Sequence, residues 1–308
     1  MKYAVLFPGQ GSQTVGMCAD ARNERPGLVG PVADEIVGWD INALIDEGSE
    51  EDLTKTQHAQ PALYAVSFAL WSVFSDAVGV APTAGAGHSL GEYTALAAAD
   101  AIGYLDGLSL VAKRGSAMAM SAAESSSGMA ALLGADLETA EKVAALRRSE
   151  GGALYVANIN APGQIVLAGG TDDLAWLTAE ARGLGIRRAI VLKVAGGFHS
   201  PFMASAAESL GQALASTTMK APDFDIYANV SGQPTLDPRA TLGDQLTSTV
   251  RFAETLEAMA GAGIDTFVHV GPGDVTAGLA KRAVKGATVH VVSTTDQARA
   301  IAELLSVE

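Results

Sequence analysis

The segment Gly87-His88-Ser89-Leu90-Gly91 constrains the fold of this chain more than any other stretch. Before it, residues 80–87 are short and mostly small, which suits the end of a buried strand. After it, residues 90–101 are rich in strong helix formers. A serine on such a strand-to-helix turn projects its hydroxyl clear of the backbone, and the flanking glycines permit the tight turn. The pattern predicts an α/β fold and makes Ser89 a candidate nucleophile beside the free N–H groups of a helix N-terminus.

The same pattern also arises in ordinary turns between a strand and a helix. Glycine is abundant here, at 34 of 308 residues, so a chance match has to be considered. Taken alone, the motif leaves catalysis and a plain structural turn both open.

Strand and helix patterns alternate over most of the chain. This alternation predicts a mainly parallel sheet covered by helices on both faces. The expected strands are 2–7, the end of 80–87, 225–230, 266–270 and 288–292, and the clearest helices are 60–78, opened near Pro61, and 106–121.

A different order occupies residues 127–195. Strands at 129–133, 153–158, 164–169 and 186–194 and helices at 137–148 and 172–184 give the βαββαβ, or ferredoxin-like, arrangement. The turn Asn160-Ala161-Pro162-Gly163 is expected to form the central hairpin. We therefore expect an α/β-hydrolase-like catalytic domain of residues 1–126 and 196–308, with a small ferredoxin-like domain of residues 127–195 inserted into it. A cleft between the two is the natural ligand site.

Charge and composition exclude several classes of function. The net charge of −14 argues against nucleic-acid binding, and a polyanionic substrate would need a local basic patch. No apolar run approaches the roughly 20 residues that span a bilayer, and the apolar run in residues 1–11 is too short for a signal peptide. Cys18 is the sole cysteine, so no internal disulfide or cysteine metal cluster is expected. We expect a cytoplasmic monomer with no membrane or nucleic-acid partner, metal or prosthetic group.

His199 is the best candidate for a base that activates Ser89. It lies in the sequence GGFHSP at 196–201, a loop between a strand and a helix, and loops carry function more often than regular elements do. His88 adjoins Ser89 but is expected to point away from it. The other three, His58 before a helix and His269 and His290 in strand-like segments, fit structural roles. Residues 184–198 contain no carboxylate to orient the imidazole, so a carbonyl or an amide is expected to do so.

Arg114 is the second unusual residue. It shares a helix face with Leu110, Val111, Ala117 and Met118, and an arginine on an apolar face needs an anionic partner. That partner is either a core carboxylate or the carboxylate of a substrate.

Gln10 lies in a glycine-rich turn, FPGQGSQ at 7–13, directly after the first predicted strand. The turn lacks the lysine of a phosphate-binding loop. It is either a plain turn or a place from which the backbone N–H of Gln10 contributes to an oxyanion hole.

Seven short motifs occur in an order that resembles the malonyl-CoA:acyl carrier protein transacylases, the malonyltransferases of fatty-acid synthesis. They are PGQGSQ at 8–13, GHSLGE at 87–92, KRG at 113–115, NINAPGQ at 158–164, GFHSPFM at 197–203, DQL at 244–246 and GPG at 271–273. The resemblance runs from Pro8 to about Arg282, and seven motifs in order make it highly specific.

The resemblance implies a two-step acyl transfer. Ser89 attacks the thioester of malonyl-CoA with His199 as base, and the N–H groups of Gln10 and Leu90 hold the oxyanion. Arg114 binds the malonyl carboxylate. The pantetheine thiol of acyl carrier protein then takes the malonyl group from Ser89.

Further positions are assigned only by the resemblance. The main-chain carbonyl of Gln245 orients His199, and Asn158 and Asn160 line the cleft near the pantetheine. Leu90 and Phe198 match members that load malonyl rather than branched acyl groups. The chain departs from the family pattern at Ala119, Thr249 and Asp274, outside these positions.

Two alternatives stay open at this point. The same chemistry fits a discrete acyltransferase that loads a polyketide or other carrier protein. A serine thioesterase is a second possibility, against which Arg114 and the missing carboxylate argue.

Overall fold

A five-stranded parallel sheet forms the centre of the larger part of the molecule. The computed structural model describes residues 2–306. The strands follow the order β7-β2-β1-β8-β9, and every neighbouring pair is parallel. They are β1 (Tyr3–Phe7), β2 (Ala84–Gly87), β7 (Asp225–Ile226), β8 (Thr266–Val270) and β9 (Thr288–Val292). The predicted parallel sheet is confirmed, and the unbroken apolar run of β1 reflects its central, fully buried position.

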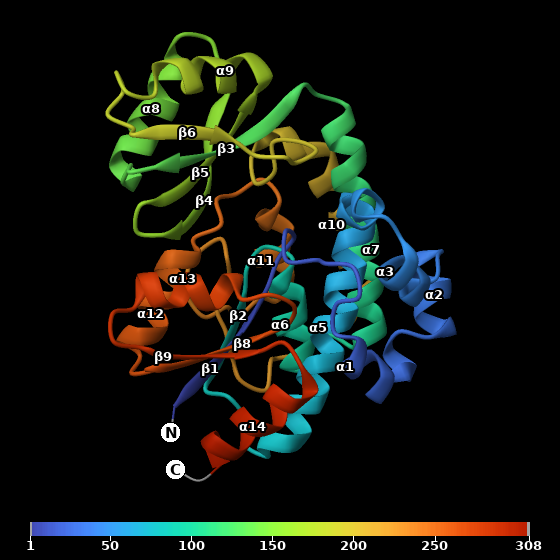
Figure 1. Cartoon of the computed structure of the whole chain (residues 1–308). Coiled ribbons are helices and arrows are strands. Elements are labelled where there is room, and N and C mark those ends of the chain that lie inside the picture. Colours follow the sequence, from blue (N-terminus) through green and yellow to red (C-terminus); the bar gives the residue numbers. More distant parts are fainter. Residues whose placement is uncertain (1, 307–308) are drawn as a thin grey trace.

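Helices cover both faces of this sheet. Alternate residues of β1 enter different cores: Tyr3, Val5 and Phe7 pack into one, and Ala4 and Leu6 into the other. The first core contains α5 (Thr56–Val78), α6 (Gly91–Ala98), α7 (Tyr104–Ala123), α10 (Ala204–Ser216) and α14 (Thr295–Ser306). The second contains α12 (Phe252–Gly261) and α13 (Val275–Ala283), which lie across the sheet from α5 and α6 (Figure 1).

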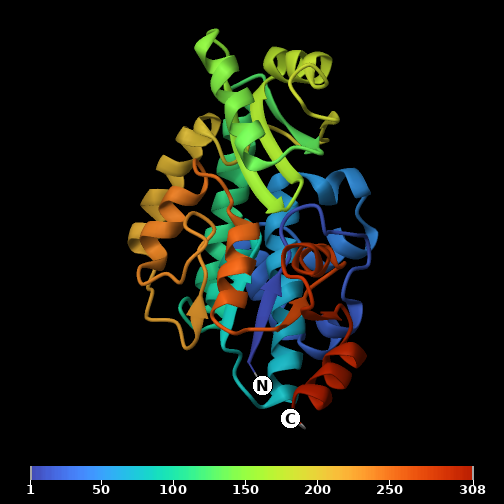
Figure 2. The ribbon, with the colours of Figure 1, turned by 90° about the vertical axis from the view of Figure 1, so that its left-hand side faces the viewer.

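A four-stranded antiparallel sheet forms a separate layer. Its order is β4-β5-β3-β6, which is the ferredoxin-like order for a βαββαβ unit. The elements are β3 (Ser127–Leu133), α8 (Leu137–Ser149), β4 (Leu154–Ala161), β5 (Gln164–Gly170), α9 (Thr171–Glu180) and β6 (Arg188–Val191). In both views this unit sits at the end of the molecule opposite the two chain termini (Figures 1 and 2).

The two faces of the small sheet have different partners. Ala130 and Leu132 of β3 pack beneath α8 and α9, whereas the alternate residues Met129 and Ala131 pack into the core of the large sheet's helices. A main-chain bridge also joins the small unit to the large one, because the N–H of Ile159 in β4 donates to the carbonyl of Val250 over 2.8 Å. The small unit is therefore packed onto the large one rather than tethered by its linkers alone.

Thr249 strengthens this junction. Its hydroxyl donates to the carbonyl of Val156 over 2.7 Å, at the irregular register of β4 between Val156 and Asn158. The departure from the family pattern at this position thus satisfies a carbonyl that the bulge displaces.

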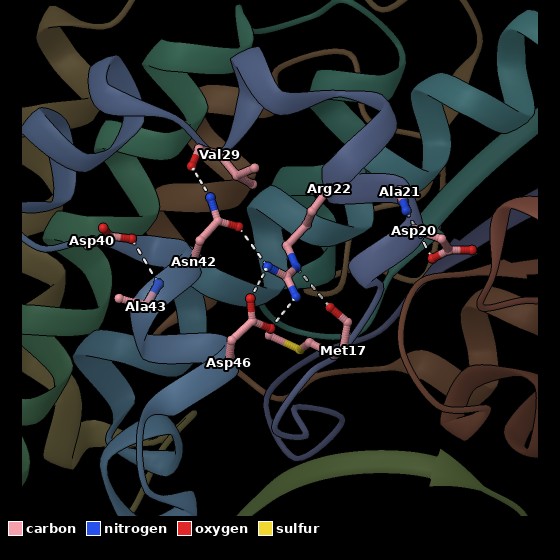
Figure 3. A network of polar contacts seen from close by, with 9 residues as sticks. All are labelled: Met17, Asp20, Ala21, Arg22, Val29, Asp40, Asn42, Ala43 and Asp46. Atoms are coloured by element: carbon pink, nitrogen blue, oxygen red, sulfur yellow. Dashed lines mark hydrogen bonds and ion pairs between the residues drawn. The ribbon is translucent and has the colours of Figure 1, made fainter.

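Four short helices near the N-terminus were not anticipated from the sequence. They are α1 (Ala19–Glu24), α2 (Pro31–Val37), α3 (Ile41–Glu47) and α4 (Glu50–Thr54), each too short for a clear periodic signal. Arg22 holds α1 to α3 (Figure 3): its guanidinium pairs with Asp46 at 2.6 and 3.0 Å and donates to Asn42 at 2.7 Å.

Several expected boundaries are wrong. Helix α5 begins at Thr56 rather than near Pro61, so His58 lies within the helix and not before it. Pro61 is the sixth residue of the helix and so lies inside it. Strand β6 ends at Val191 instead of 194, and β7 has two residues instead of six. The segment after β6 turns away from the sheet toward the cavity described below.

Among the described residues, α5 is the one helix long and apolar enough to cross a membrane by length and composition. Most of it is buried within the fold, under the sheet and between α7 and α14. Its apolar character is therefore that of a core helix.

Candidate active site

Ser89 occupies a strained turn between β2 and α6. Its φ of 52° lies in the left-handed region that non-glycine residues rarely adopt. The flanking glycines are required by space: a Cβ on Gly87 would lie 1.8 Å from the backbone of Gly91, and a Cβ on Gly91 would lie 2.3 Å from the carbonyl oxygen of Phe7. The backbone N–H of Ser89 donates to Oδ1 of Asn229 over 2.7 Å, which holds the turn. The turn predicted from the sequence is present, with its serine at the carboxyl end of the parallel sheet.

His199 lies against this serine. Its Nε2 is 2.8 Å from Oγ of Ser89, and its Nδ1 is 2.9 Å from the main-chain oxygen of Gln245. Because a carbonyl oxygen only accepts, Nδ1 carries the proton in the neutral ring and Nε2 is free to accept from the serine hydroxyl. His199 also has a positive φ, of 56°, so both members of the pair are held in an uncommon backbone conformation.

The environment keeps the imidazole neutral. Burial, the charge of Arg114 and the neighbouring His88 together lower the pKa of His199 to about 3, and the hydrogen bond to Gln245 opposes this only in part. At neutral pH the ring is therefore ready to accept a proton from Ser89.

Arg114 projects from α7 into the site and is 1% exposed. Its guanidinium donates to Oε1 of Gln60 at 2.6 Å, to Oε1 of Gln245 at 2.9 Å and to Oγ of Ser89 at 3.0 Å. No carboxylate within residues 2–306 forms an ion pair with it. Arg22 shows the contrast, since that equally buried arginine has Asp46 for a partner (Figure 3). Of the two alternatives for Arg114, a core carboxylate in contact is therefore wrong.

Gln245 connects most of the site. While its main-chain oxygen faces His199, its side-chain Nε2 donates to the carbonyl of Ser89 at 3.0 Å and to Oε2 of Glu92 at 2.7 Å. The residue lies at the end of α11 (Pro238–Gln245) and is fully buried. One side chain thus fixes the nucleophile's backbone and Arg114 together.

A cavity of about 270 Å³ opens above Ser89, between the large unit and the small inserted unit. Seven of the nine predicted site residues line it, namely Gln10, Ser89, Arg114, Asn158, Asn160, Phe198 and His199. The other two, Leu90 and Gln245, are almost fully buried and do not line the cavity. The loop after β6 contributes Leu192, Lys193 and Val194 to the wall.

Two backbone N–H groups are available beside the serine. Within the described chain, neither the N–H of Gln10 nor that of Leu90 donates a hydrogen bond, whereas that of Gly91 is used by His88. Leu90 precedes the first turn of α6, so its N–H adds to the positive end of the helix dipole. This arrangement can stabilise an oxyanion.

The cleft residues are also fixed by neighbours. His88 points away from Ser89, as expected, and its Nε2 lies 2.7 Å from Oδ1 of Asn160. Asn158 is 6% exposed at the bridge to Val250, and Phe198 is 7% exposed beside His199.

Comparison with known proteins agrees with this geometry. Residues 5–302 match the family model described as acyl transferase domain. The malonyl CoA-acyl carrier protein transacylase of Bacillus subtilis (strain 168) is 40% identical over 286 residues, which cover 91% of this chain and 90% of that protein. The chain belongs to the acyl transferase family.

Solved structures of this acyltransferase family share the whole fold. An acyl carrier protein S-malonyltransferase from Vibrio cholerae superimposes with a TM-score of 0.91 at 36% identity, covering 98% of this chain and all of that one. A malonyl-transacylase solved with its type II polyketide acyl carrier protein gives a TM-score of 0.93 at 34% identity, covering 99% and 100%. The α/β fold with a smaller inserted domain is confirmed.

Three polar residues of this acyltransferase site were not anticipated. Glu92 and Asn229 hold Gln245 and the Ser89 turn, and Gln60 of α5 holds Arg114. Glu92 could have been found, since a carboxylate in the otherwise apolar helix after Ser89 is anomalous. Gln60 and Asn229 reach the site from distant segments, and neither stands out in its own sequence context.

Proposed function

We propose that this chain transfers a malonyl group from malonyl-CoA to the pantetheine thiol of acyl carrier protein through a malonyl ester on Ser89. The observation that carries the proposal is the fully buried Arg114, which has no carboxylate partner in the described structure and is aimed at the Ser89 hydroxyl. A substrate with a free carboxylate supplies that missing partner.

The first half-reaction is acylation of Ser89. His199 Nε2 accepts the hydroxyl proton while Oγ attacks the thioester carbonyl, and the N–H groups of Gln10 and Leu90 stabilise the oxyanion. The carbon–sulfur bond then breaks, His199 returns the proton to the departing thiolate, and CoA leaves as its thiol. The second half-reaction reverses these roles, with the carrier's thiol as the nucleophile.

Arg114 has a second effect in this scheme. It donates to Ser89 Oγ and lowers the pKa of His199, and both effects restrain the nucleophile. A malonyl carboxylate that pairs with the guanidinium draws it away from Oγ and offsets its charge, which raises the pKa of His199. The substrate that fits Arg114 therefore also activates the catalytic pair.

Cleft residues complete the assignment. We assign Asn158 and Asn160, which line the cavity, to binding of the pantetheine amides, and Phe198 to restricting space beside the α-carbon of the acyl group. Relatives named malonyl CoA-acyl carrier protein transacylase support the loading of a carrier protein with malonyl. We propose that this chain does so for fatty-acid synthesis in the cytoplasm. The solved complex with a polyketide carrier protein supports carrier loading in polyketide synthesis as the second candidate.

Hydrolysis is disfavoured by the orientation of the base. His199 is held by a carbonyl oxygen, not by a carboxylate, which stabilises the imidazolium less. Attack by water on the acyl-serine depends more on a strong base than attack by the carrier's thiol does, because a thiol is far more acidic than water. The positive charge of Arg114 also favours an acyl group that carries a carboxylate.

The test is intact-protein mass spectrometry after brief mixing with malonyl-CoA or with acetyl-CoA, without carrier protein. We expect a malonyl adduct that maps to Ser89, little acetyl adduct, and transfer when carrier protein is added. Ser89→Ala should form none, while Ser121→Ala, which removes a buried hydroxyl on α7, should still form it. Steady CoA release without an adduct would indicate a hydrolase. Comparing fatty-acid and polyketide carriers as acceptors separates the two candidates.

A further inference from the structure

Glu92 is a buried carboxyl group that the acyl-transfer steps do not use. It lies in the second position of α6 and is fully buried. Its Oε2 accepts from Nε2 of Gln245 at 2.7 Å and from the N–H of Asn229 at 3.1 Å. Its Oε1 has no hydrogen-bond partner within the described residues. One oxygen therefore holds the network and the other is free.

Glu92 and Arg114 are linked through a single amide. Gln245 donates to Glu92 from Nε2 and accepts from Arg114 at Oε1, so it lies between the two charges. Neither group has an ion pair with any other residue in the described part of the chain. The two are thus a buried, amide-separated charge pair in which each offsets the other.

Few other ionisable groups face this pair. Tyr93 on the same helix lies under the guanidinium, whose carbon is 5.4 Å from the ring centre, and burial raises its pKa to about 12. His199 and His88 are neutral at pH 7, because burial lowers the pKa of both. Helix α5 presents the uncharged Gln60, and strands β1 and β2 consist of apolar residues and glycine apart from Tyr3 at the far end of β1.

We propose that Glu92 takes up a proton from solvent when a malonyl carboxylate pairs with Arg114, and releases it when the malonyl group leaves. The inference rests on the proposed function, because it requires a carboxylate at Arg114. In the empty site the ionised Glu92 balances the guanidinium. In the loaded site the malonyl carboxylate balances it instead, and Glu92 becomes a surplus buried negative charge.

The free oxygen makes this uptake possible without rearrangement. A proton on Oε1 leaves both hydrogen bonds to Oε2 in place, so Gln245 keeps its orientation. Burial raises the pKa of Glu92 to about 7 even though the hydrogen bonds from Asn229 and Gln245, and to a smaller extent the charge of Arg114, oppose the rise. Neutralising that charge raises the pKa further, so a group largely ionised at slightly alkaline pH becomes protonated.

The test counts protons and adducts in the same sample. Enzyme is mixed with malonyl-CoA in weak buffer just above pH 7 with a pH indicator, and the malonyl adduct is quantified by mass spectrometry. Exchanging a thioester for an ester and a thiol has no net proton change, because the thiol stays protonated. Because Glu92, with a pKa of about 7, is a little over half ionised at that pH, we expect uptake of roughly half a proton per adduct with malonyl-CoA, and none per adduct with acetyl-CoA.

Two variants make the count specific. Glu92→Gln keeps an acceptor for Gln245 and Asn229, and we expect no proton uptake per malonyl adduct. Asp173→Asn removes another buried acid, paired with Arg147 in the small unit, and should leave the uptake intact. The count is per adduct, so a change in acylation rate does not alter it. Full adduct without uptake in the unaltered enzyme, or the same uptake in Glu92→Gln, overturns the inference. Absence of any malonyl adduct refutes the proposed function instead.

A measurement on the unaltered enzyme covers the case in which Glu92→Gln does not fold. Difference infrared spectroscopy across malonyl loading should show a new carboxylic-acid carbonyl band that shifts in deuterium oxide, whereas the ester band does not shift. Loading without that band contradicts protonation of a carboxyl group.

Discussion

The guanidinium of Arg114 donates to the hydroxyl of Ser89 over 3.0 Å, so the proposed carboxylate-binding group and the proposed nucleophile are in direct contact. Recognition of the acyl carboxylate and activation of the serine hydroxyl are therefore expected to occur at the same place in the cavity. An acyl-CoA without a carboxylate leaves Arg114 on Ser89 Oγ, and the nucleophile stays restrained.

Replacing Arg114 by alanine should reduce selectivity more than reactivity. The variant loses a charged hydrogen bond to the malonyl carboxylate worth about 1.5–3 kcal/mol, so preference for malonyl-CoA over acetyl-CoA should fall roughly tenfold to a hundredfold. The ratio of the two adducts in a competition experiment measures this. Arg22→Ala is the matched control, because it removes another buried arginine, and should lower stability without altering the ratio. An unchanged ratio in Arg114→Ala contradicts the role given to Arg114.

Gln245→Ala should separate the two functions of that residue. The variant keeps the main-chain oxygen that holds His199 but loses the side-chain bonds to Arg114, Glu92 and the Ser89 carbonyl. We expect acetyl adduct formation to persist and malonyl preference to drop, with a loss of about 1–3 kcal/mol in the free energy of unfolding. Adduct ratios and urea denaturation measure these effects. Complete loss of acetyl adduct would show that the side chain, too, is needed for the base.

The pH dependence of acylation should lack the usual histidine inflection. Burial and Arg114 lower the pKa of His199 to about 3, so the imidazole stays neutral as the pH falls through 6.5. The rate of acetyl adduct formation should therefore show no protonation of His199 near pH 6.5. In Arg114→Ala the positive charge is gone, the pKa of His199 rises, and the acid limb should move to higher pH. Rapid-quench rates across pH test both. The same profile in both enzymes contradicts the electrostatic link.

Phe198→Ala should relax the restriction on acyl size. Phe198 is buried in the cavity wall beside His199, so its removal opens space for an α-methyl group. Discrimination against methylmalonyl-CoA should weaken roughly tenfold or more, as expected for one methyl group in a hydrophobic pocket. Phe202→Ala, three residues beyond His199 and outside the cavity wall, should not change it. Adduct formation from the two donors measures the ratio.

Much of this architecture could be predicted from local sequence. The Ser89 turn, the βαββαβ order and three strand boundaries of the large sheet could be predicted because each follows from a local pattern of apolar and turn residues. The helices between residues 19 and 54 could not, because each has two turns at most and is held by tertiary contacts such as those of Arg22. Likewise β6 was predicted too long, since the apolar residues Leu192 and Val194 face the cavity rather than a sheet.

The site divides in the same way. Ser89, His199 and Arg114 stand out by residue type in their own segments. The partners that hold them do not, because Gln60, Asn229 and Gln245 lie in segments far apart in the chain. Their roles can be seen only in the folded chain, where their amides surround the guanidinium of Arg114 and the Ser89 turn.

The hydrogen-bond acceptor for His199 belongs to the main chain of Gln245. A single substitution at 245 can replace the side chain but cannot delete that oxygen, so the orientation of the base is largely insulated from point mutation. The proposed carboxylate-binding group, Arg114 held by Gln60 and Gln245, consists of side chains, so a single substitution can remove it. Acyl preference in this scaffold is therefore expected to drift more readily than the ability to form an acyl-serine.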